Sequence, residues 1–251
     1  MAYEEFSRIY DKLIKEDINY KEITKRILSI ASDNSINMDD YLDLACGTGN
    51  VSCLLSDKFK NTYLVDMSYD MLSEANNKFL EKGLKASVVC QDMTELNLMQ
   101  KFDLITCVLD STNYLLYDDE LEDYFKGIYN HLKDNGIFIF DINSYYKISN
   151  ILGNNIYIHN EDDIFYSWEN EFEDDIVSMY LTFFVRNNET GLYEKFEEEH
   201  EERGYKESFI EQVLNKCNLK VINKFNGYTN EAVNNKSERI LYVVKKYKIV
   251  R

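Results

Sequence analysis

The chain has 251 residues, of which 45% are hydrophobic, and its formal net charge is −17. This length suits one large globular domain or a domain with an insertion. The negative charge disfavours nucleic acids and anionic membranes as partners, because both attract basic surfaces. We expect a cytoplasmic protein, since residues 1–17 are too charged for a secretory leader, no stretch of 18 apolar residues marks a membrane span, and the five cysteines include no CxxC pair.

The first 31 residues show the spacing of amphipathic helices, which predicts helical structure at the N-terminal end. The apolar positions that repeat at helical spacing are Phe6, Ile9, Tyr10, Leu13, Ile23, Ile27, Leu28 and Ala31.

Strand and helix signals then alternate. Apolar segments predict strands at residues 40–45, 61–66, 86–90, 102–109 and 137–141. Helices are predicted at residues 50–59, between Ser68 and Gly83, and from Leu121 to Leu132, with caps where Ser68 and Gly83 stand. Such alternation predicts a parallel sheet with right-handed crossover helices.

The pattern changes after the fifth strand. Apolar residues alternate with period two, as in Val177, Met179 and Leu181, which predicts antiparallel strands. We expect an inserted β-rich substrate lid at residues 144–204, and a main domain made of residues 1–143 and 205–251. In that main domain a helix at 206–217 and strands at 219–225 and 240–245 complete the chain.

The insertion is strongly acidic. Between Glu161 and Glu202 the sequence holds 15 Asp and Glu residues against Arg186 and Lys195. A solvated face explains this run most simply, and attraction of a cationic substrate is the alternative.

A glycine loop follows the first predicted strand. The segment Asp43-Leu44-Ala45-Cys46-Gly47-Thr48-Gly49 reads as a strand with an acid near its end that runs into a Gly-x-Gly turn and a helix. Glycines let the backbone approach a ligand, and the helix start offers free N–H groups. Acids also end later strands, at Asp66, Asp92 and Asp110. Any one of them could merely cap a helix, but together they predict one nucleotide-type site at the carboxyl edge of the sheet.

These segments resemble a class I S-adenosylmethionine-dependent methyltransferase of the small-molecule type, over residues 1–143 and from Lys206 onward. The resemblance implies an α/β Rossmann-like fold: a mostly parallel seven-stranded sheet with helices on both faces and an antiparallel β insertion after the fifth strand. It also implies S-adenosylmethionine as cofactor. That molecule carries an ammonium, a sulfonium and a carboxylate but no phosphate, so its site needs carboxylates as well as free N–H groups.

The resemblance assigns roles to individual residues. Asp43 would support the loop and the amino group, Asp66 the ribose hydroxyls, and Asp92 the adenine amine. The complete set of expected cofactor-binding residues is Tyr20, Asp43, Ala45, Gly47, Gly49, Asp66, Met67, Gln91, Asp92, Met93, Leu109 and Asp110. No histidine or cysteine spacing suggests a metal site, and we expect none.

Catalytic residues are harder to predict, because methyl transfer is an in-line displacement that needs alignment and exclusion of water more than a nucleophile. Our candidates are Tyr10, Asn113, Tyr114, His200 and Arg203. The resemblance also suggests that the aromatic N-terminal residues Tyr3, Phe6, Tyr10 and Tyr20 fold over the cofactor. In the insertion, Tyr166, Trp168 and Phe172 share a strand face and either line the acceptor pocket or pack.

The favoured function is methyl transfer to a small-molecule N or O acceptor, by a monomer or homodimer. One alternative is a protein methyltransferase whose acidic insertion recruits a basic segment. Others are a non-enzymatic cofactor sensor and an NAD-type oxidoreductase. Against the last, Ser52 replaces the third glycine of the dinucleotide fingerprint and Asp43 would repel a pyrophosphate.

Overall fold

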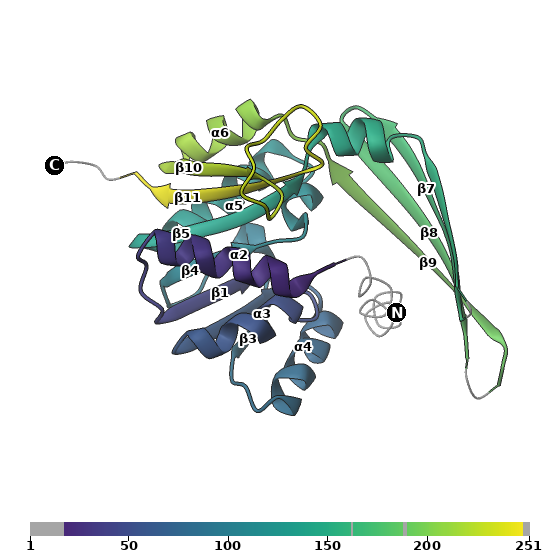
Figure 1. Cartoon of the computed structure of the whole chain (residues 1–251), viewed down its shortest axis with the longest axis horizontal. Helices are drawn as coiled ribbons and strands as arrows, with labels where there is room; N and C mark the ends of the chain where they lie inside the picture. The colour runs from purple at the N-terminus through teal and green to yellow at the C-terminus, as the bar shows by residue number, and fades with distance from the viewer. Residues whose placement is uncertain (1–17, 162, 188–189, 248–251) are drawn as a thin grey trace.

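A computed structural model describes residues 18–161, 163–187 and 190–247 (Figure 1). Within these residues the main sheet has seven strands in the order β10-β11-β5-β4-β1-β2-β3. Their bounds are β1 Asp40–Leu44, β2 Asn61–Asp66, β3 Ser87–Cys90, β4 Phe102–Cys107, β5 Leu132–Asn143, β10 Leu219–Asn226 and β11 Arg239–Lys246. Strands β1 to β5 pair in parallel, whereas β11 runs antiparallel to both β5 and β10.

Helices cover both faces of this sheet. Their bounds are α2 Tyr20–Asp33, α3 Asn50–Leu55, α4 Tyr69–Glu81, α5 Asp118–His131 and α6 Glu207–Lys216. Strand residues alternate between the two faces: Ile137 and Ile139 pack with α2 and α3, whereas Phe138 and Phe140 pack with α5 and α6. The apolar strands are therefore buried on both faces, as a parallel sheet requires.

A second sheet of four antiparallel strands projects from one side of the main sheet (Figure 1). Its strands are β6 Ile156–Glu161, β7 Ile164–Glu173, β8 Ile176–Arg186 and β9 Tyr193–Arg203. A π-helical segment, η4 Lys147–Leu152, joins it to β5 and packs Ile148 and Leu152 against Val177 and Met179. The expected mostly parallel sheet and antiparallel insertion are thus confirmed.

Local signals explain most element ends. Ser68 caps α4 by accepting a hydrogen bond from the Met71 amide at 3.2 Å, as its sequence context predicted. The helix predicted at residues 50–59 instead ends at Leu55 and continues as a short 3₁₀ turn, η1 Ser56–Lys58. The first half of the predicted N-terminal helical region lies outside the described residues. In the part of the chain that is described, no helix is long and apolar enough to cross a bilayer.

Candidate active site

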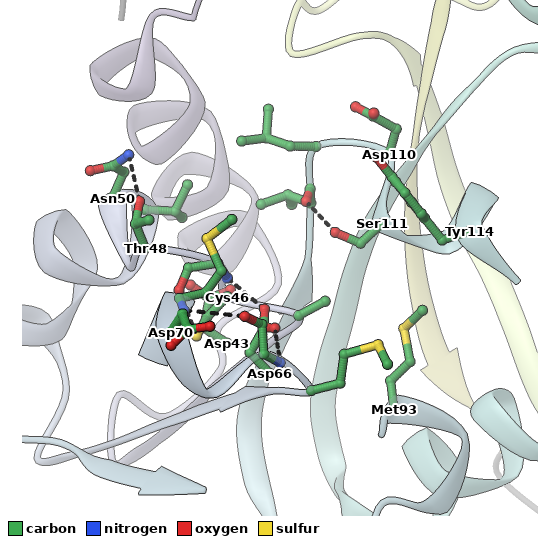
Figure 2. A pocket seen from close by; sticks show the side chains of 18 of the residues that line it. Asp43, Cys46, Thr48, Asn50, Asp66, Asp70, Met93, Asp110, Ser111 and Tyr114 are labelled. Carbon is green, nitrogen blue, oxygen red and sulfur yellow. Dashed lines mark hydrogen bonds between the residues drawn. The ribbon is translucent and has the colours of Figure 1, made fainter. Parts of the chain in front are cut away.

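A cavity of about 510 Å³ lies at the carboxyl edge of the main sheet, where β1, β2 and β4 end (Figure 2). Nine of the expected cofactor-binding residues line it: Tyr20, Asp43, Ala45, Gly47, Asp66, Met67, Met93, Leu109 and Asp110. Two catalytic candidates, Tyr114 and His200, line it as well. The acids at the ends of β1, β2 and β4 are thus gathered in one place, as the parallel sheet order dictates.

Asp66 fixes the glycine loop. One of its oxygens, Oδ2, accepts a hydrogen bond from the Gly47 amide at 2.8 Å, and Oδ1 accepts one from the Ser68 amide at 2.9 Å. Gly47 has φ of +52°, and a Cβ built on it would meet no atom within 4 Å. The loop therefore leaves open space beside its backbone, where a ligand fits. Each oxygen of Asp66 keeps a lone pair, because a carboxylate offers about four acceptor sites.

Asp43 is the most buried acid of the loop, with 2% of its surface exposed. Its Oδ1 accepts a hydrogen bond from the Thr106 hydroxyl at 2.7 Å, and its Oδ2 accepts one from the Ser52 hydroxyl. Burial raises the pKa of Asp43 to about 6 in spite of these donors. A cationic ligand group in the cavity would favour the ionised carboxylate and so bind more tightly where Asp43 has lost its proton.

The end of β4 has an unusual backbone. Leu109 and Asp110 are consecutive non-glycine residues with positive φ, at +63° and +59°. Such conformations are strained and persist where surrounding groups enforce them. Here Asp141 does so, because its carboxylate accepts hydrogen bonds from the Leu109 amide at 2.6 Å and the Asp110 amide at 3.3 Å.

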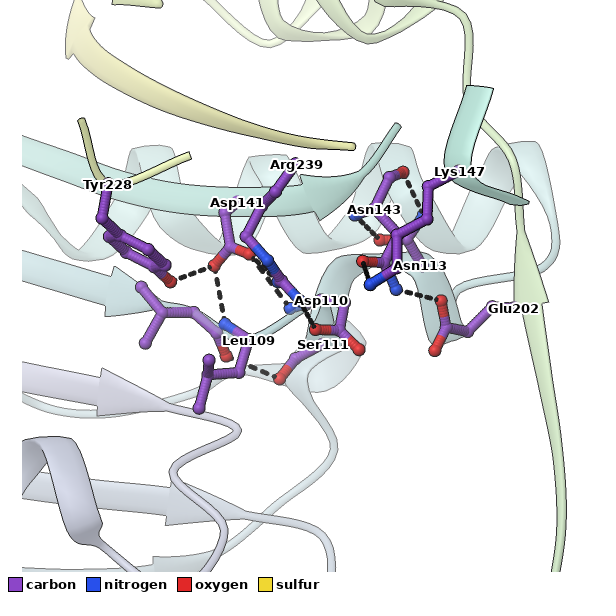
Figure 3. A network of polar contacts seen from close by, with 11 residues as sticks. Leu109, Asp110, Ser111, Asn113, Asp141, Asn143, Lys147, Glu202, Tyr228 and Arg239 are labelled. Atoms are coloured by element: carbon purple, nitrogen blue, oxygen red, sulfur yellow. Dashed lines mark hydrogen bonds and ion pairs between the residues drawn. The ribbon is translucent and has the colours of Figure 1, made fainter. Parts of the chain in front are cut away.

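Asp141 and Asp110 share one cation (Figure 3). The Arg239 Nη2 lies 2.6 Å from Asp110 Oδ1, its Nη1 pairs with Asp141, and the Tyr228 hydroxyl donates to Asp141 at 2.8 Å. Burial would raise the pKa of Asp110, but the positive charges of Arg239 and Lys147 outweigh burial and hold that pKa below its usual value. Sequence reasoning missed this network. Asp141 carried the same signal as the other acids, an acidic end to an apolar strand, whereas nothing local marked Arg239 or Tyr228.

Asn113 and Arg203 need a correction, because neither catalytic candidate lines the cavity. Asn113 is fully buried and holds two strands together: its side-chain amide donates to the backbone oxygens of Asn143 at 3.1 Å and Arg203 at 2.9 Å. The Arg203 guanidinium pairs with Asp118 at 2.7 Å and lies 4.9 Å from the centre of the Tyr205 ring. Both residues therefore support the cavity wall from behind.

Gly49, Gln91 and Asp92 also lie outside the cavity lining, contrary to expectation. Gly49 begins α3 with φ of +73°, and a Cβ there would lie 3.0 Å from the Ala75 Cβ, so it serves packing between α3 and α4. Asp92 accepts a hydrogen bond from the Thr94 amide at 2.8 Å and so caps a 3₁₀ turn. Gln91 bonds to the backbone six residues further along the chain. For Asp92 the simple capping explanation describes this structure.

The aromatic residues of the insertion mainly pack. Trp168 and Phe172 join the apolar cluster around Ile148, and Tyr166 stacks on His159 with ring centres 5.0 Å apart. None of these residues lines the cavity. Of the two expectations for this strand face, packing is the one that the structure shows.

Tyr114 and His200 both line the cavity although they are far apart in the sequence. Tyr114 follows β4, and His200 lies on β9. Their rings meet edge to face with centres 6.0 Å apart. Burial lowers the pKa of His200, so its imidazole is neutral near pH 7. Tyr3, Phe6 and Tyr10, expected to fold over the cofactor, lie outside the described residues, whereas Tyr20 lines the cavity from the start of α2.

Residues 42–136 match the family model described as a methyltransferase domain. A putative methyltransferase of Geobacillus sp. (strain WCH70) is 33% identical over 98% of this chain and all of its own length. The crystal structure of an S-adenosylmethionine-dependent methyltransferase from Clostridium acetobutylicum has 53% identity and a TM-score of 0.93, covering 99% of this chain and 100% of that one. The chain belongs to the S-adenosylmethionine-dependent methyltransferases.

The cofactor of this methyltransferase is S-adenosylmethionine, which excludes the NAD-type alternative. The residues present fit that molecule: the cavity offers the carboxylates of Asp43 and Asp66 to cationic and hydroxyl groups and leaves space beside Gly47. The fold also occurs in the sugar N-methyltransferase KedS8 of Streptoalloteichus sp., with 16% identity and a TM-score of 0.77 over 95% of this chain and 93% of that one.

Proposed function

We propose that this methyltransferase acts on a nitrogen or oxygen atom of a small molecule. The observation that carries the proposal is the shape of the cavity: one wall is the glycine loop, and the facing wall is made by Asp110, Tyr114 and His200. Groups for a cofactor and groups for an acceptor thus border one space of about 510 Å³. Such a volume suits small molecules, whose sites are typically about 300–1,000 Å³.

Each wall has a distinct task in this proposal. Asp43 and Asp66 hold the amino group and the ribose of the cofactor, and the glycine loop passes beside it. The bound cofactor supplies an electrophilic methyl group on sulfur. The acceptor wall aligns the attacking atom and excludes water, and the neutral imidazole of His200 and the hydroxyl of Tyr114 orient the acceptor.

Further support comes from the similar fold named as a sugar N-methyltransferase and from the net charge of −17, which disfavours nucleic acid. We also propose that residues 144–204 act as the substrate-binding insertion, because His200 reaches the cavity from β9. We also propose that the enzyme acts as a monomer or homodimer.

A protein substrate is the rival, and the placement of acids on β9 disfavours it. Glu197, Glu199 and Glu201 are exposed, whereas His200 lies between them in sequence and lines the cavity. Because successive strand residues point to opposite faces, the exposed acids point away from the cavity. They form a solvated face that does not lead a basic peptide to the methyl group.

The first test is thermal unfolding with S-adenosylmethionine, its demethylated product S-adenosylhomocysteine, and NAD. Saturation at about 100 times the dissociation constant adds about 2.7 kcal/mol, which raises the melting temperature by about 5–10 °C for a domain of this size. We expect this shift with the first two compounds and none with NAD. The Asp66→Asn variant has nearly the same size but lacks the charge and one of the two oxygens that accept from the Gly47 and Ser68 amides, so it should shift less.

The acceptor class is tested with methyl-labelled cofactor and a cell extract separated by mass. Label is expected in the low-mass fraction, in a form stable to mild base if nitrogen is the acceptor. Label confined to the protein fraction would overturn the small-molecule proposal while leaving the enzyme a methyltransferase.

A further inference from the structure

A third acid stands behind the acceptor wall. Glu202 lies on β9 with 3% of its surface exposed, and its Oε2 accepts a hydrogen bond from the Asn143 side-chain amide at 2.8 Å. Its carboxyl group meets that of Asp110, which lines the cavity. Figure 3 shows both acids reaching toward the same point from β9 and from the loop after β4. A buried pair of carboxyl groups cannot readily hold two negative charges, so one of them retains a proton.

The surrounding charges show which acid holds it. Burial and the negative charge of Asp110 raise the pKa of Glu202 to about 8, whereas Arg239 and Lys147 hold the pKa of Asp110 low. The proton therefore resides on Glu202 at neutral pH. Lys147 also donates to the Asn143 side-chain oxygen at 3.0 Å, which completes the ring of groups around the pair.

The charge balance of this region is short by one positive charge. Among the described residues that face the pair, three are acids (Asp110, Asp141 and Glu202) and two are permanent cations (Lys147 and Arg239). His200, on the same strand, is neutral because burial lowers its pKa. The proton on Glu202 supplies the missing charge. An ammonium group in the cavity beside Asp110 would supply it equally well, whereas a hydroxyl or a carboxylate would not.

We propose that Asp110 and Glu202 form a carboxyl pair that selects an amine as methyl acceptor and receives the proton which that amine loses. This inference rests on the proposed small-molecule function and narrows it to amines. Asp110 contacts the amine, and Glu202 acts through Asp110 as a positioning residue.

The protons balance over one turnover. The acceptor enters as an ammonium, and Glu202 releases its proton to solvent. The ammonium then gives one proton to the pair and becomes a neutral amine. Its nitrogen forms a bond to the methyl carbon while the carbon–sulfur bond breaks, and sulfur keeps that electron pair. The product leaves as a methylammonium, and the pair again holds one proton.

Sinefungin tests this proposal without knowledge of the acceptor. In this cofactor analogue an amine-bearing carbon replaces the methyl sulfonium, so its ammonium lies where the methyl group leaves. Affinities for sinefungin and for S-adenosylhomocysteine are measured by titration calorimetry on the full chain between about pH 6 and pH 8.5. The preference for sinefungin should rise by nearly a hundredfold over this range, because affinity changes about tenfold per pH unit below the Glu202 pKa of about 8 and levels off above it. A preference that is independent of pH overturns the proposal.

Two variants distinguish the effect of the Asp110–Glu202 pair on the sinefungin preference from the effect of burying any acid on β9. In Glu202→Gln the side chain keeps an oxygen for Asn143 but cannot ionise, so the preference should no longer rise with pH. Glu198→Gln is the matched control, because Glu198 is also buried on β9, with 7% exposed, but is not paired with Asp110. It should follow the wild type, and a loss of the pH effect in this variant as well would overturn the assignment to Glu202.

Two further readouts keep the failures distinguishable. If Glu202→Gln does not fold, calorimetry of the wild type in buffers of different ionisation enthalpy still decides, since sinefungin should release about one proton more than S-adenosylhomocysteine near neutral pH. Equal proton release overturns the proposal. Absence of S-adenosylhomocysteine binding to the wild type would instead refute the cofactor site on which the proposed function stands.

Discussion

The two ends of the main sheet carry the same motif, two carboxylates that share one cation, but in different surroundings. At the amino end the Lys133 ammonium lies 2.6 Å from Asp40 and 2.8 Å from Asp103. At the carboxyl end Arg239 joins Asp110 and Asp141. The first group ties strand starts together and borders no described cavity. The second borders the cofactor cavity and has a third acid beside it. Position on the sheet, more than residue type, separates a structural cluster from a functional one.

The two ends of the sheet should differ most in the stability lost when the shared cation at each end is removed. Arg239→Met leaves Asp141, which has no exposed surface, without its paired cation and leaves Asp110 with Lys147 alone, and should lower the unfolding free energy by about 3–5 kcal/mol. Lys133→Met should lower it by about 1–2 kcal/mol, because the Lys133 side chain is 31% exposed and water reaches the acids it leaves behind. Urea unfolding measures both. Arg239→Lys, which keeps the charge, should fall between them, and equal losses for the two Met variants would remove the distinction.

Cofactor affinity should depend on the acids at the carboxyl end of the main sheet and not on those at the amino end. Asp43→Asn and Asp66→Asn are each expected to weaken S-adenosylmethionine binding by about 1–3 kcal/mol, because each strands a polar partner in the cavity. Asp103→Asn at the amino end is the control and should leave the dissociation constant unchanged. Calorimetric titration compares the three variants. Unaltered affinity in both cavity variants would refute the assignment of the site.

The two loop glycines sharpen the comparison further. Gly49→Ala combines positive φ with a 3.0 Å contact to Ala75, so it should lower stability by more than the roughly 1–2 kcal/mol of left-handed strain alone. Gly47→Ala has the same backbone strain but no close contact, so it should lower stability less. Its methyl group would enter the space beside the loop where the cofactor binds, so it should reduce cofactor affinity more than Gly49→Ala does. Thermal unfolding with and without the cofactor separates the two effects. The opposite ranking of binding losses would contradict the assigned roles.

The smallest effect is a dependence on pH. Burial raises the pKa of Asp43 to about 6, so its contribution to stability is present below its unfolded pKa and is lost as pH rises through 6. Cofactor affinity runs the other way: it should rise about tenfold from pH 5 to pH 7 and then level off, because the cation favours the carboxylate. Asp43→Asn should flatten that rise, and a rise that persists in this variant would assign it to another group.

Asp40, at the amino end, should show the opposite sign. Burial alone would raise the pKa of Asp40, but hydrogen bonds from Lys133 and Asn61 outweigh it and hold the pKa below its usual value. Its stabilising contribution is therefore present above the unfolded pKa and lost as pH falls through the folded one. Unfolding free energies of the wild type and Asp40→Asn across the acidic range measure this contribution. Stability of the wild type that increases as pH falls in that range, relative to the variant, would contradict it.

The sequence predicted what depends on local patterns. Hydrophobic periodicity located the strands, and an acid at a strand end located Asp43, Asp66 and Asp110 in the cavity. It could not show whether Asp92 caps a turn or binds the cofactor, because an acid that caps a helix and one that binds a ligand look identical in sequence; the structure shows the cap. Arg239 and Glu202 were missed for another reason: pairing of β11 with β5 brings Arg239 to the site, and a hydrogen bond to Asn143 on β5 holds Glu202 there, and no local pattern reports such contacts.

The cofactor wall and the acceptor wall come from separate stretches of the chain. The glycine loop and Asp66 precede residue 70, whereas His200 and Glu202 come from β9, inside a sheet inserted between β5 and α6. The inserted sheet is tied to the main sheet by Asn113, which bonds to both β5 and β9, and by the hydrogen bond from Asn143 on β5 to Glu202 on β9. Changes in the inserted sheet can therefore alter the part of the acceptor site that β9 contributes, while Asp110 and Tyr114 after β4 and the strands that hold the methyl donor stay as they are.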